Sequence, residues 1–363
     1  MVAKMGTSSV TDADGAVDVV AIEKLCSEVV ALRAAGHQVV VVTSGAITAG
    51  LPALATLGMG SRRPSDLATL QAIAAVGQSR LMRVYDDVLE GQGLVAGQVL
   101  LAPLDFAHRQ QYLHARQTLA RLLELGVVPV VNENDAVADD EIRFGDNDRL
   151  AALVAHLVGA DLLVLLTDTV GLLSADPRLD GHATLIEEVV EIDHELEAVV
   201  GGPGSERASG GMASKLAAAR IAAWSGVAVV IAAAARPGVL VGALAGEAVG
   251  TAVRPRNRRM SARKLWIAFA VGASGTLVVD DGARVALVER GSSLLPAGVV
   301  GVRGDFAADQ AVEIEDPDGR VFAKGLVRHP SHRVARWIGR RTSDLADEGV
   351  TEIVHRDDLV TLT

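Results

Sequence analysis

Short apolar runs alternate with longer helical patterns through the first 250 residues, and this alternation restricts the fold more than any other feature of the chain. Five runs are expected as strands, at 39–42, 94–101, 127–131, 161–167 and 227–231. Helical spacing predicts a helix that starts near 19 and ends at Gly36, and further helices at 67–89, 110–125, 149–158 and 212–224. This order predicts an α/β fold, a three-layer αβα sandwich with a mainly parallel central sheet. Only 3% of the residues are aromatic, so the core must consist of Ala, Val and Leu.

The pattern changes at residues 254–264, which carry six basic side chains and no acidic one. We therefore expect a first domain at 1–253, a basic connector at 254–271 and a second domain at 272–363. The second domain shows short β-like segments, which predict a small mainly-β barrel with one helix near 331–338. Its expected strands are 276–279, 284–288, 299–302, 311–314 and 321–326, with hairpin turns at Asp281-Gly282 and Asp318-Gly319.

Charge and cysteine content narrow the class of protein. The first 250 residues carry 17 Lys and Arg against 30 Asp and Glu, or −13, whereas the remaining residues carry 17 against 15, or +2. Cys26 is the single cysteine, which excludes a disulfide scaffold and a cysteine-based zinc site and fits a reducing compartment. There is no apolar run of transmembrane length and no secretory signal pattern, so we expect a cytoplasmic protein without a membrane contact.

Five loops could carry chemistry, because ligands bind at the strand-to-helix loops of parallel sheets. Residues 4–9 combine Lys4 with a glycine and three hydroxyl side chains, and residues 43–46 lead from a strand into a helix through Ser44 and Gly45. Both loops suit an anion, because glycine admits a close approach and helix N-termini offer free N–H groups. Taken alone, the lysine could be a surface residue and Ser44 only an N-cap.

The other three loops differ in chemistry. Two polar clusters, 132–135 and 145–148, hold the acids and amides that an amino acid needs as hydrogen-bond partners. Thr167 and Asp168 follow a strand and suit a nucleotide, although an ordinary strand cap would look similar. Glycines at 201–211 precede a helix that bears Lys215, an arrangement that can hold phosphate but lacks the P-loop sequence. Taken alone, this segment could be a flexible loop.

Two absences indicate the kind of reaction. None of the nine histidines lies in these five loops, and no Gly-x-Ser-x-Gly elbow is present. A reaction whose nucleophile is already ionised needs no histidine base, and a carboxylate at pH 7 is such a nucleophile.

In their order along the chain, these loops closely resemble the glutamate 5-kinases of the amino-acid kinase superfamily. The pair Asn132-Glu133-Asn134-Asp135 and Gly145-Asp146-Asn147-Asp148 distinguishes this branch from aspartate, acetylglutamate and uridylate kinases. The other matching segments are 4–8, 42–47, 75–81, 166–168, 175–178 and 210–215. Residues 289–296 and 355–358 resemble the PUA domain that many of these kinases carry. Only three residues precede Lys4, whereas the first apolar strand of these kinases is usually longer.

The resemblance implies transfer of the ATP γ-phosphoryl group to the side-chain carboxylate of L-glutamate, the first step of proline biosynthesis, with feedback inhibition by proline. It implies that Lys4, Asp148 and Lys215 are catalytic and that Ser44, Asp135 and Asn147 bind glutamate. ATP would be bound by Lys4, Thr167, Asp168, Ser209, Gly210, Gly211, Met212, Ala213, Ser214 and Lys215. Mg²⁺ is the expected second cofactor, held mostly by nucleotide oxygens and water with no protein metal site assigned. A homo-oligomer, a dimer or a tetramer, is also expected.

Two alternatives remain open from the sequence. One is another carboxylate or carbamate kinase of the same fold. The other is RNA binding through the second domain, where five arginines and Trp337 lie on or near the predicted helix: Arg328, Arg333, Arg336, Arg340 and Arg341. A helix face of arginines is more often simply solvated.

Overall fold

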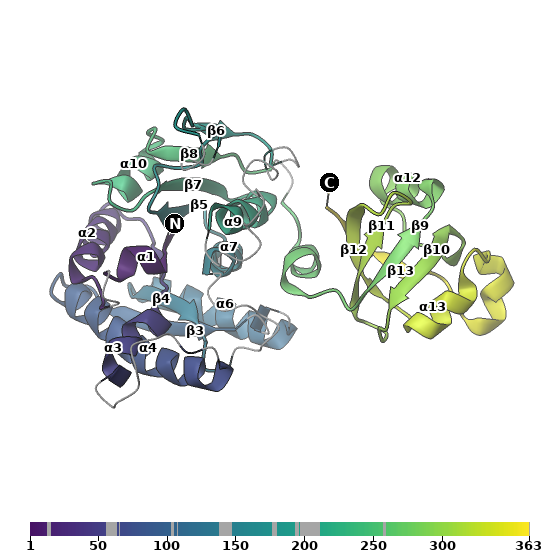
Figure 1. Ribbon diagram of the computed structural model, residues 1–363, viewed down its shortest axis with the longest axis horizontal. Helices are drawn as coiled ribbons and strands as arrows, with labels where there is room; N and C mark the ends of the chain where they lie inside the picture. Colours follow the sequence, from purple (N-terminus) through teal and green to yellow (C-terminus); the bar gives the residue numbers. More distant parts are fainter. Residues whose placement is uncertain are drawn as a thin grey trace. The chain divides into compact units, whose positions relative to one another are not determined.

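The computed structural model describes residues 1–12, 16–55, 64, 66–102, 105–106, 108–137, 147–175, 180–192, 196, 211–256 and 259–362. The chain divides into two compact units, Met1–Arg259 and Met260–Thr363 (Figure 1). Each unit has its own sheet and its own buried core. No helix among the described residues is both long and apolar enough to cross a membrane.

The first unit is built on an eight-stranded sheet of order β3-β4-β2-β1-β5-β7-β8-β6. Among the strands that the structure describes in this sheet, only the β7–β8 pairing is antiparallel, so the mainly parallel sheet predicted from the sequence is confirmed. Its strands are β1 (Val2–Met5), β2 (Val40–Val42), β3 (Ala96–Leu101), β4 (Val128–Glu133), β5 (Leu162–Thr167), β6 (Glu188–Val189), β7 (Ala228–Ala233) and β8 (Gly250–Val253).

Strand β1 lies at the centre of this sheet although it has only four residues. All four are buried, and Lys4 pairs with Val42 of β2 on one side and with Leu165 of β5 on the other. The chain leaves β1 toward β2 and later returns to β5 on the opposite side. A parallel sheet opens a crevice at such a switch point, beyond the carboxyl ends of its strands.

Helices cover both faces of the sheet, as the three-layer prediction requires (Figure 1). One layer contains α2 (Val19–Ala34), α4 (Leu67–Glu90) and α10 (Val239–Ala245), which share one apolar core with the strands. The other contains α6 (Arg109–Glu124), α7 (Asn147–Val158) and α9 (Met212–Trp224). Helix α7 packs against β1, β2, β4 and β5, so its first residues lie at the carboxyl edge of the central strands.

Helix α3 (Ala46–Ala55) packs against α4 at backbone distance, and two glycines make this approach feasible. A Cβ atom on Gly77 would lie 1.8 Å from the carbonyl oxygen of Ala46, and one on Gly50 would lie 2.1 Å from that of Ile73. No larger side chain fits at either position without separating the helices. The contact fixes the part of α4 that follows Gly77 next to the start of α3.

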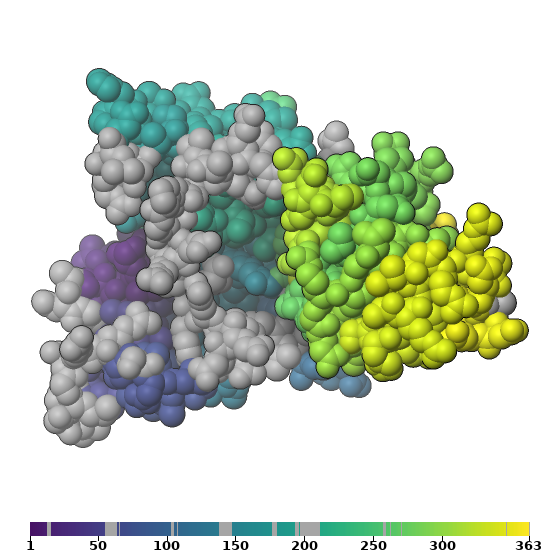
Figure 2. All heavy atoms as spheres, turned by 45° about the vertical axis from the view of Figure 1, so that its right-hand side comes forward, coloured from purple at the N-terminus to yellow at the C-terminus, as the bar shows by residue number. Residues whose placement is uncertain are grey.

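The second unit contains a five-stranded sheet of order β10-β9-β11-β12-β13, and Figure 2 shows its packed side chains from one side. The strands are β9 (Gly275–Val279), β10 (Val299–Gly304), β11 (Ala311–Glu315), β12 (Val321–Val327) and β13 (Val354–Thr361). The predicted turn at Asp318-Gly319 joins the antiparallel pair β11 and β12. The predicted helix near 331–338 is α13 (Ser331–Trp337).

One predicted strand and one predicted turn in this unit are wrong. Residues 284–288 and the Asp281-Gly282 pair all belong to a helix, α12 (Asp281–Arg290). The Asp280 side chain accepts a hydrogen bond from the N–H of Ala283, so the Asp-Asp-Gly sequence caps a helix instead of closing a hairpin. Gly291, with a φ of 58°, ends the helix in the left-handed conformation.

Two arginines of the basic segment that follows β8 pair with acids. Arg254 makes two hydrogen bonds to Glu188, and Arg256 pairs with Glu191 while its guanidinium lies over the Trp224 ring. Further along, α11 (Ala262–Leu265) runs into a π-helix at Trp266–Ala270. These arginines therefore hold the end of the first unit against its own sheet and helix α9.

Candidate functional site

Three charged side chains from distant parts of the sequence meet at the carboxyl edge of the central strands. The Asp148 carboxylate, at the start of α7, lies between two ammonium groups. Lys4 Nζ at the end of β1 is 2.7 Å from Asp148 Oδ1, and Lys215 Nζ in the first turns of α9 is 3.0 Å from Oδ2. All three side chains are almost fully buried. The three residues predicted to be catalytic are therefore brought together.

The electrostatics of this cluster favour an anionic ligand. Burial alone would raise the pKa of Asp148, but the two lysines and a hydrogen bond from the Ser214 hydroxyl hold that pKa below its usual value. The aspartate therefore stays ionised, and among the described residues one carboxylate faces two ammonium groups. The excess positive charge lies in a low-dielectric environment, where it attracts phosphate more strongly than a surface lysine would.

A second, uncharged group of side chains begins at the neighbouring residue, Asn147. Its Nδ2 donates toward the carbonyl oxygen of Thr43 at 2.6 Å, Asn132 Oδ1 at 2.7 Å and Ser44 Oγ at 2.9 Å. Asn132 in turn donates to Gln78 Oε1 at 2.7 Å. We call Ser44, Gln78, Asn132 and Asn147 the amide network; all four are buried.

The turn after β2 places Ser44 in this network. Gly45 has a φ of +94°, a conformation that L side chains rarely adopt, and a Cβ atom there would lie 2.8 Å from Val10 Cγ2. The glycine therefore allows the chain to turn sharply between the Ser44 side chain and the start of α3. Of the residues predicted to bind glutamate, Ser44 and Asn147 are thus in direct contact.

The third predicted glutamate residue, Asp135, lies in the turn that follows β4 and is half-buried. It is three residues beyond Asn132, so the same strand supplies both the amide network and this carboxylate. The polar cluster that the sequence singles out after 131 is therefore divided: Asn132 is a buried partner of Asn147, whereas Asp135 extends further along the turn. Gly145 and Asp146 of the second cluster lie outside the described residues.

The described residues predicted to bind ATP lie near the end of β1, at the end of β5 and in the first turns of α9. Buried Thr167 donates a hydrogen bond to Asp168 Oδ1 at 3.0 Å, and Asp168 itself is exposed. Helix α9 begins after Gly211, which has no side-chain cap, and continues through Met212, Ala213 and Ser214 to Lys215. An uncapped N-terminus leaves N–H groups for an anion. Ser209 and Gly210 lie outside the described residues.

Sequence reasoning gave no role to two residues on α4. Gln78 bonds to Asn132, and the Tyr85 hydroxyl lies 3.0 Å from Thr43 Oγ1. Tyr85 comes seven residues after Gln78, which places both on one face of the helix. The available signal was the polar side chain of Gln78 among the apolar positions Leu70, Ile73, Ala74 and Leu81 of this helix.

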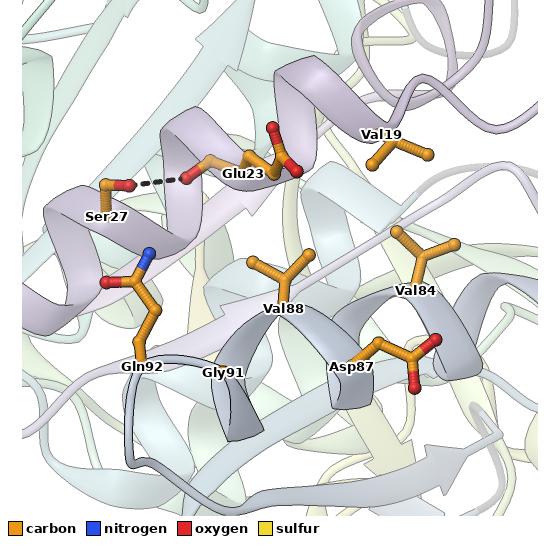
Figure 3. A pocket seen from close by; sticks show the side chains of 8 residues that line it. All are labelled: Val19, Glu23, Ser27, Val84, Asp87, Val88, Gly91 and Gln92. Atoms are coloured by element: carbon orange, nitrogen blue, oxygen red, sulfur yellow. Dashed lines mark hydrogen bonds between the residues drawn. The ribbon is translucent and has the colours of Figure 1, made fainter.

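A groove elsewhere on the first unit does not share these properties. It has a volume of about 560 Å³ and lies between α2 and α4 (Figure 3). Glu23 and Asp87 line it together with three valines, and its eight lining residues include no basic side chain. A groove with two carboxylates repels phosphate, so we place the functional site at the charged cluster and the amide network.

Two further sequence hypotheses can be compared with the structure. Among the described residues, no group of three His, Cys, Asp or Glu side chains could hold a metal ion.

In the second unit, Trp337 is 1% exposed and donates to Glu348, while Arg328 and Arg340 pair with Glu352 and Glu348. A buried indole offers no face for stacking a base, so this helix lacks the aromatic platform that RNA binding commonly uses.

Two protein families and several curated relatives are similar to this chain in sequence. The amino acid kinase family matches residues 1–233, and the PUA domain matches residues 275–348. A glutamate 5-kinase of Frankia casuarinae is 51% identical, covering all of this chain and 96% of the relative. Glutamate 5-kinases of Moorella thermoacetica, 46% identical, and Nocardia farcinica, 48% identical, cover 100% and 99% of this chain and 96% of each relative. The chain belongs to the glutamate 5-kinase branch of the amino acid kinase family and carries a PUA domain after its kinase domain.

Proposed function

We propose that this chain transfers the γ-phosphoryl group of ATP to the side-chain carboxylate of L-glutamate, giving L-glutamyl 5-phosphate, the first intermediate toward proline. The observation that carries the proposal is the buried Lys4–Asp148–Lys215 cluster directly beside the uncharged amide network. Two adjoining sites, one for phosphate and one for a polar small molecule, suit a kinase that acts on an amino acid. The relatives named glutamate 5-kinase support the choice of substrate.

Phosphoryl transfer needs alignment and charge stabilisation more than acid–base chemistry. The attacking glutamate carboxylate is already ionised at neutral pH, so no general base is required. Lys4 and Lys215 neutralise the charge that develops on the transferred group and on the leaving oxygen. Asp148 cannot offset that charge; it keeps the two ammonium groups in position, with 2.7 and 3.0 Å contacts on its two oxygens.

The substrate end of the site is assigned to Ser44, Asp135 and Asn147. Ser44 can donate to a carboxylate, whereas Asp135 and the carbonyl oxygen of Asn147 can accept from an ammonium group. ATP is assigned to the edge formed by Thr167, Asp168 and the start of α9, with Lys4 and Lys215 near the phosphates. Gly211, Met212 and Ala213 would then offer backbone N–H groups at a positive helix end.

Magnesium belongs to this proposal as a companion of ATP. Both oxygens of Asp148 are engaged by lysines and Ser214, and the described residues contain no cluster of acids or histidines suited to a metal. The described residues therefore do not supply a protein site for the ion. Its expected ligands are phosphate oxygens and water, as Mg²⁺ commonly prefers.

The proposal also includes an inhibitor and an assembly. Proline, as the end product, is expected to inhibit by competing with glutamate near residues 132–148. A homo-oligomer, a dimer or tetramer, is the expected assembly. RNA binding remains a weaker alternative, because two of the five arginines near α13, Arg328 and Arg340, pair with acids and Trp337 is buried.

A substrate panel tests the proposed function. The purified chain is given ATP and Mg²⁺ with glutamate, aspartate or N-acetylglutamate, with and without proline, and the acyl phosphate is trapped with hydroxylamine. Glutamate-dependent ADP formation with an equal amount of hydroxamate is expected. Equal or faster turnover with aspartate or N-acetylglutamate would contradict the substrate assignment and favour another carboxylate kinase of this fold. Inhibition that glutamate does not relieve would contradict competition by proline.

A further inference from the structure

We propose that Gln78, on helix α4, is a positioning residue that helps to keep the carbonyl oxygen of Asn147 available as an acceptor for the ammonium group of the substrate. This inference rests on the proposed function and concerns how the same site recognises glutamate. Gln78 acts through Asn132 and need not touch the substrate itself. It therefore controls which substrate is accepted more than the rate of phosphoryl transfer.

The orientation of both asparagine amides follows from their backbone contacts. The carbonyl oxygen of Thr43 can only accept, so the Asn147 group 2.6 Å away must be the NH₂ group. The N–H of Glu133 can only donate, so the Asn132 atom 2.9 Å away must be its oxygen. These two backbone groups belong to the ends of β2 and β4, which the sheet holds in place.

With Asn132 oriented in this way, its NH₂ group faces α4 and needs an acceptor in a buried position. Gln78 Oε1, at 2.7 Å, is that acceptor. Gly77 makes the contact feasible, because the absence of a side chain lets α4 approach within backbone distance of α3. A buried donor without a partner is unfavourable, so removing the Gln78 oxygen should let Asn132 turn away from this arrangement.

The consequence for the substrate lies at Asn147. Its NH₂ group faces three acceptors, Thr43, Asn132 and Ser44, whereas its Oδ1 atom has no hydrogen-bond partner among the described residues. Asn147 is 4% exposed, so this oxygen favours a ligand that brings a donor. Glutamate brings an ammonium group at its α-carbon. Glutarate, the same dicarboxylate without the amine, leaves the oxygen unsatisfied.

The test measures steady-state kinetics with glutamate and with glutarate for the wild-type chain and for Gln78→Met, which keeps the length of the side chain but removes the acceptor. We expect the KM for glutamate to rise about tenfold, equivalent to about 1.4 kcal/mol. The kcat with saturating glutamate and the KM for ATP should stay within about twofold. The preference for glutamate over glutarate, as the ratio of kcat/KM values, should fall about tenfold.

Three companion variants separate positioning from a general structural role. Gln78→Glu keeps an oxygen opposite Asn132 and should retain a preference at least as strong as the wild type, whereas Gln78→Leu should behave like Gln78→Met. Tyr85→Phe is the matched control on the same helix face. Its hydroxyl contacts the Thr43 side chain, but Asn147 contacts the Thr43 backbone, so the preference should not change.

An unchanged glutamate preference in both Gln78→Met and Gln78→Leu would overturn the inference, as would an equal loss in Gln78→Glu. If neither acceptor-free variant folds in thermal melts, the glutamate preference of Gln78→Glu distinguishes the two roles of Gln78. A positioning role retains the preference, and a general structural role loses it. Failure of the proposed function has a different signature: the wild-type chain would then show no glutamate-dependent acyl phosphate at all.

Discussion

Asn147 and Asp148 are adjacent in sequence, yet they belong to two regions of opposite character. Asp148 anchors a charged cluster in which both of its oxygens contact a lysine. Asn147 anchors a neutral network in which one buried oxygen has no partner among the described residues. Both residues begin helix α7, which aims its first turn at the carboxyl edge of the sheet.

The difference shows how a single helix start can serve two purposes. A buried charge is tolerated only with partners, so each charge of this cluster has an opposite charge in contact even without a ligand. A neutral amide can leave one acceptor unsatisfied at a smaller cost, and that acceptor is then available for recognition. We therefore expect changes in the charged cluster to alter turnover and stability, and changes near the amide network to alter substrate affinity.

Removal of either lysine should have the largest effect. Lys4→Ala and Lys215→Ala are each expected to lower kcat by roughly 10²–10³, because each removes charge stabilisation of the transition state. The KM for glutamate should change by less than about threefold. Arg121→Ala, which removes an exposed arginine paired with Glu124, is the charge-matched control and should keep full activity. Near-normal turnover in either lysine variant would remove that lysine from the catalytic set.

Neutralising Asp148 should have the second largest effect. Asp148→Asn leaves two buried ammonium groups facing each other without their shared carboxylate. We expect the free energy of unfolding to fall by about 3–5 kcal/mol, as for other broken buried pairs, together with a loss of turnover. Urea denaturation followed by circular dichroism measures the first effect. An unfolding free energy within 1 kcal/mol of the wild type, a threshold well below the usual cost of a broken buried pair, would show that the cluster tolerates free charges.

The variant Asp135→Ala tests whether changes near the amide network alter substrate affinity. Asp135→Ala should raise the KM for glutamate about tenfold while kcat changes little, because the carboxylate is expected to contact the ammonium group in both ground and transition states. The KM for ATP serves as the internal control and should not change. An unchanged glutamate KM would remove Asp135 from the pocket and leave Ser44 and Asn147 as its remaining assigned residues.

The smallest expected effect is a dependence of stability on acid pH. The pKa of Asp148 is lower in the folded chain than its usual value, so the ion pairs contribute fully above about pH 4. This contribution is lost as pH falls through the folded pKa, because protonation removes the charge that the lysines need. Between pH 5 and pH 2 the unfolding free energy of the wild type should therefore fall more steeply than that of Asp148→Asn. Parallel curves would contradict the depressed pKa.

The fold could be predicted where one local pattern was sufficient. Apolar strands such as Val128–Glu133 and helices such as Met212–Trp224 follow from periodicity alone, and the structure confirms them within a few residues. The prediction failed at residues 281–290, because an Asp-Gly pair suits both a hairpin turn and the first turn of a capped helix. Only the packing of Leu287 into the second core decides between these two.

The sequence by itself determined the apolar strands, the acidic first unit and the presence of Lys4, Asp148 and Lys215 in loops that follow strands or open helices. Tertiary structure alone decided that these three charges meet within 3.0 Å and that Gln78 supports Asn147 through Asn132. The physical reason is that such contacts join residues from 15 positions apart, as for Asn132 and Asn147, to 144 positions apart, as for Lys4 and Asp148 (148 minus 4). Their distances depend on how the sheet orders its strands and how closely α4 approaches at Gly77, which no local pattern encodes.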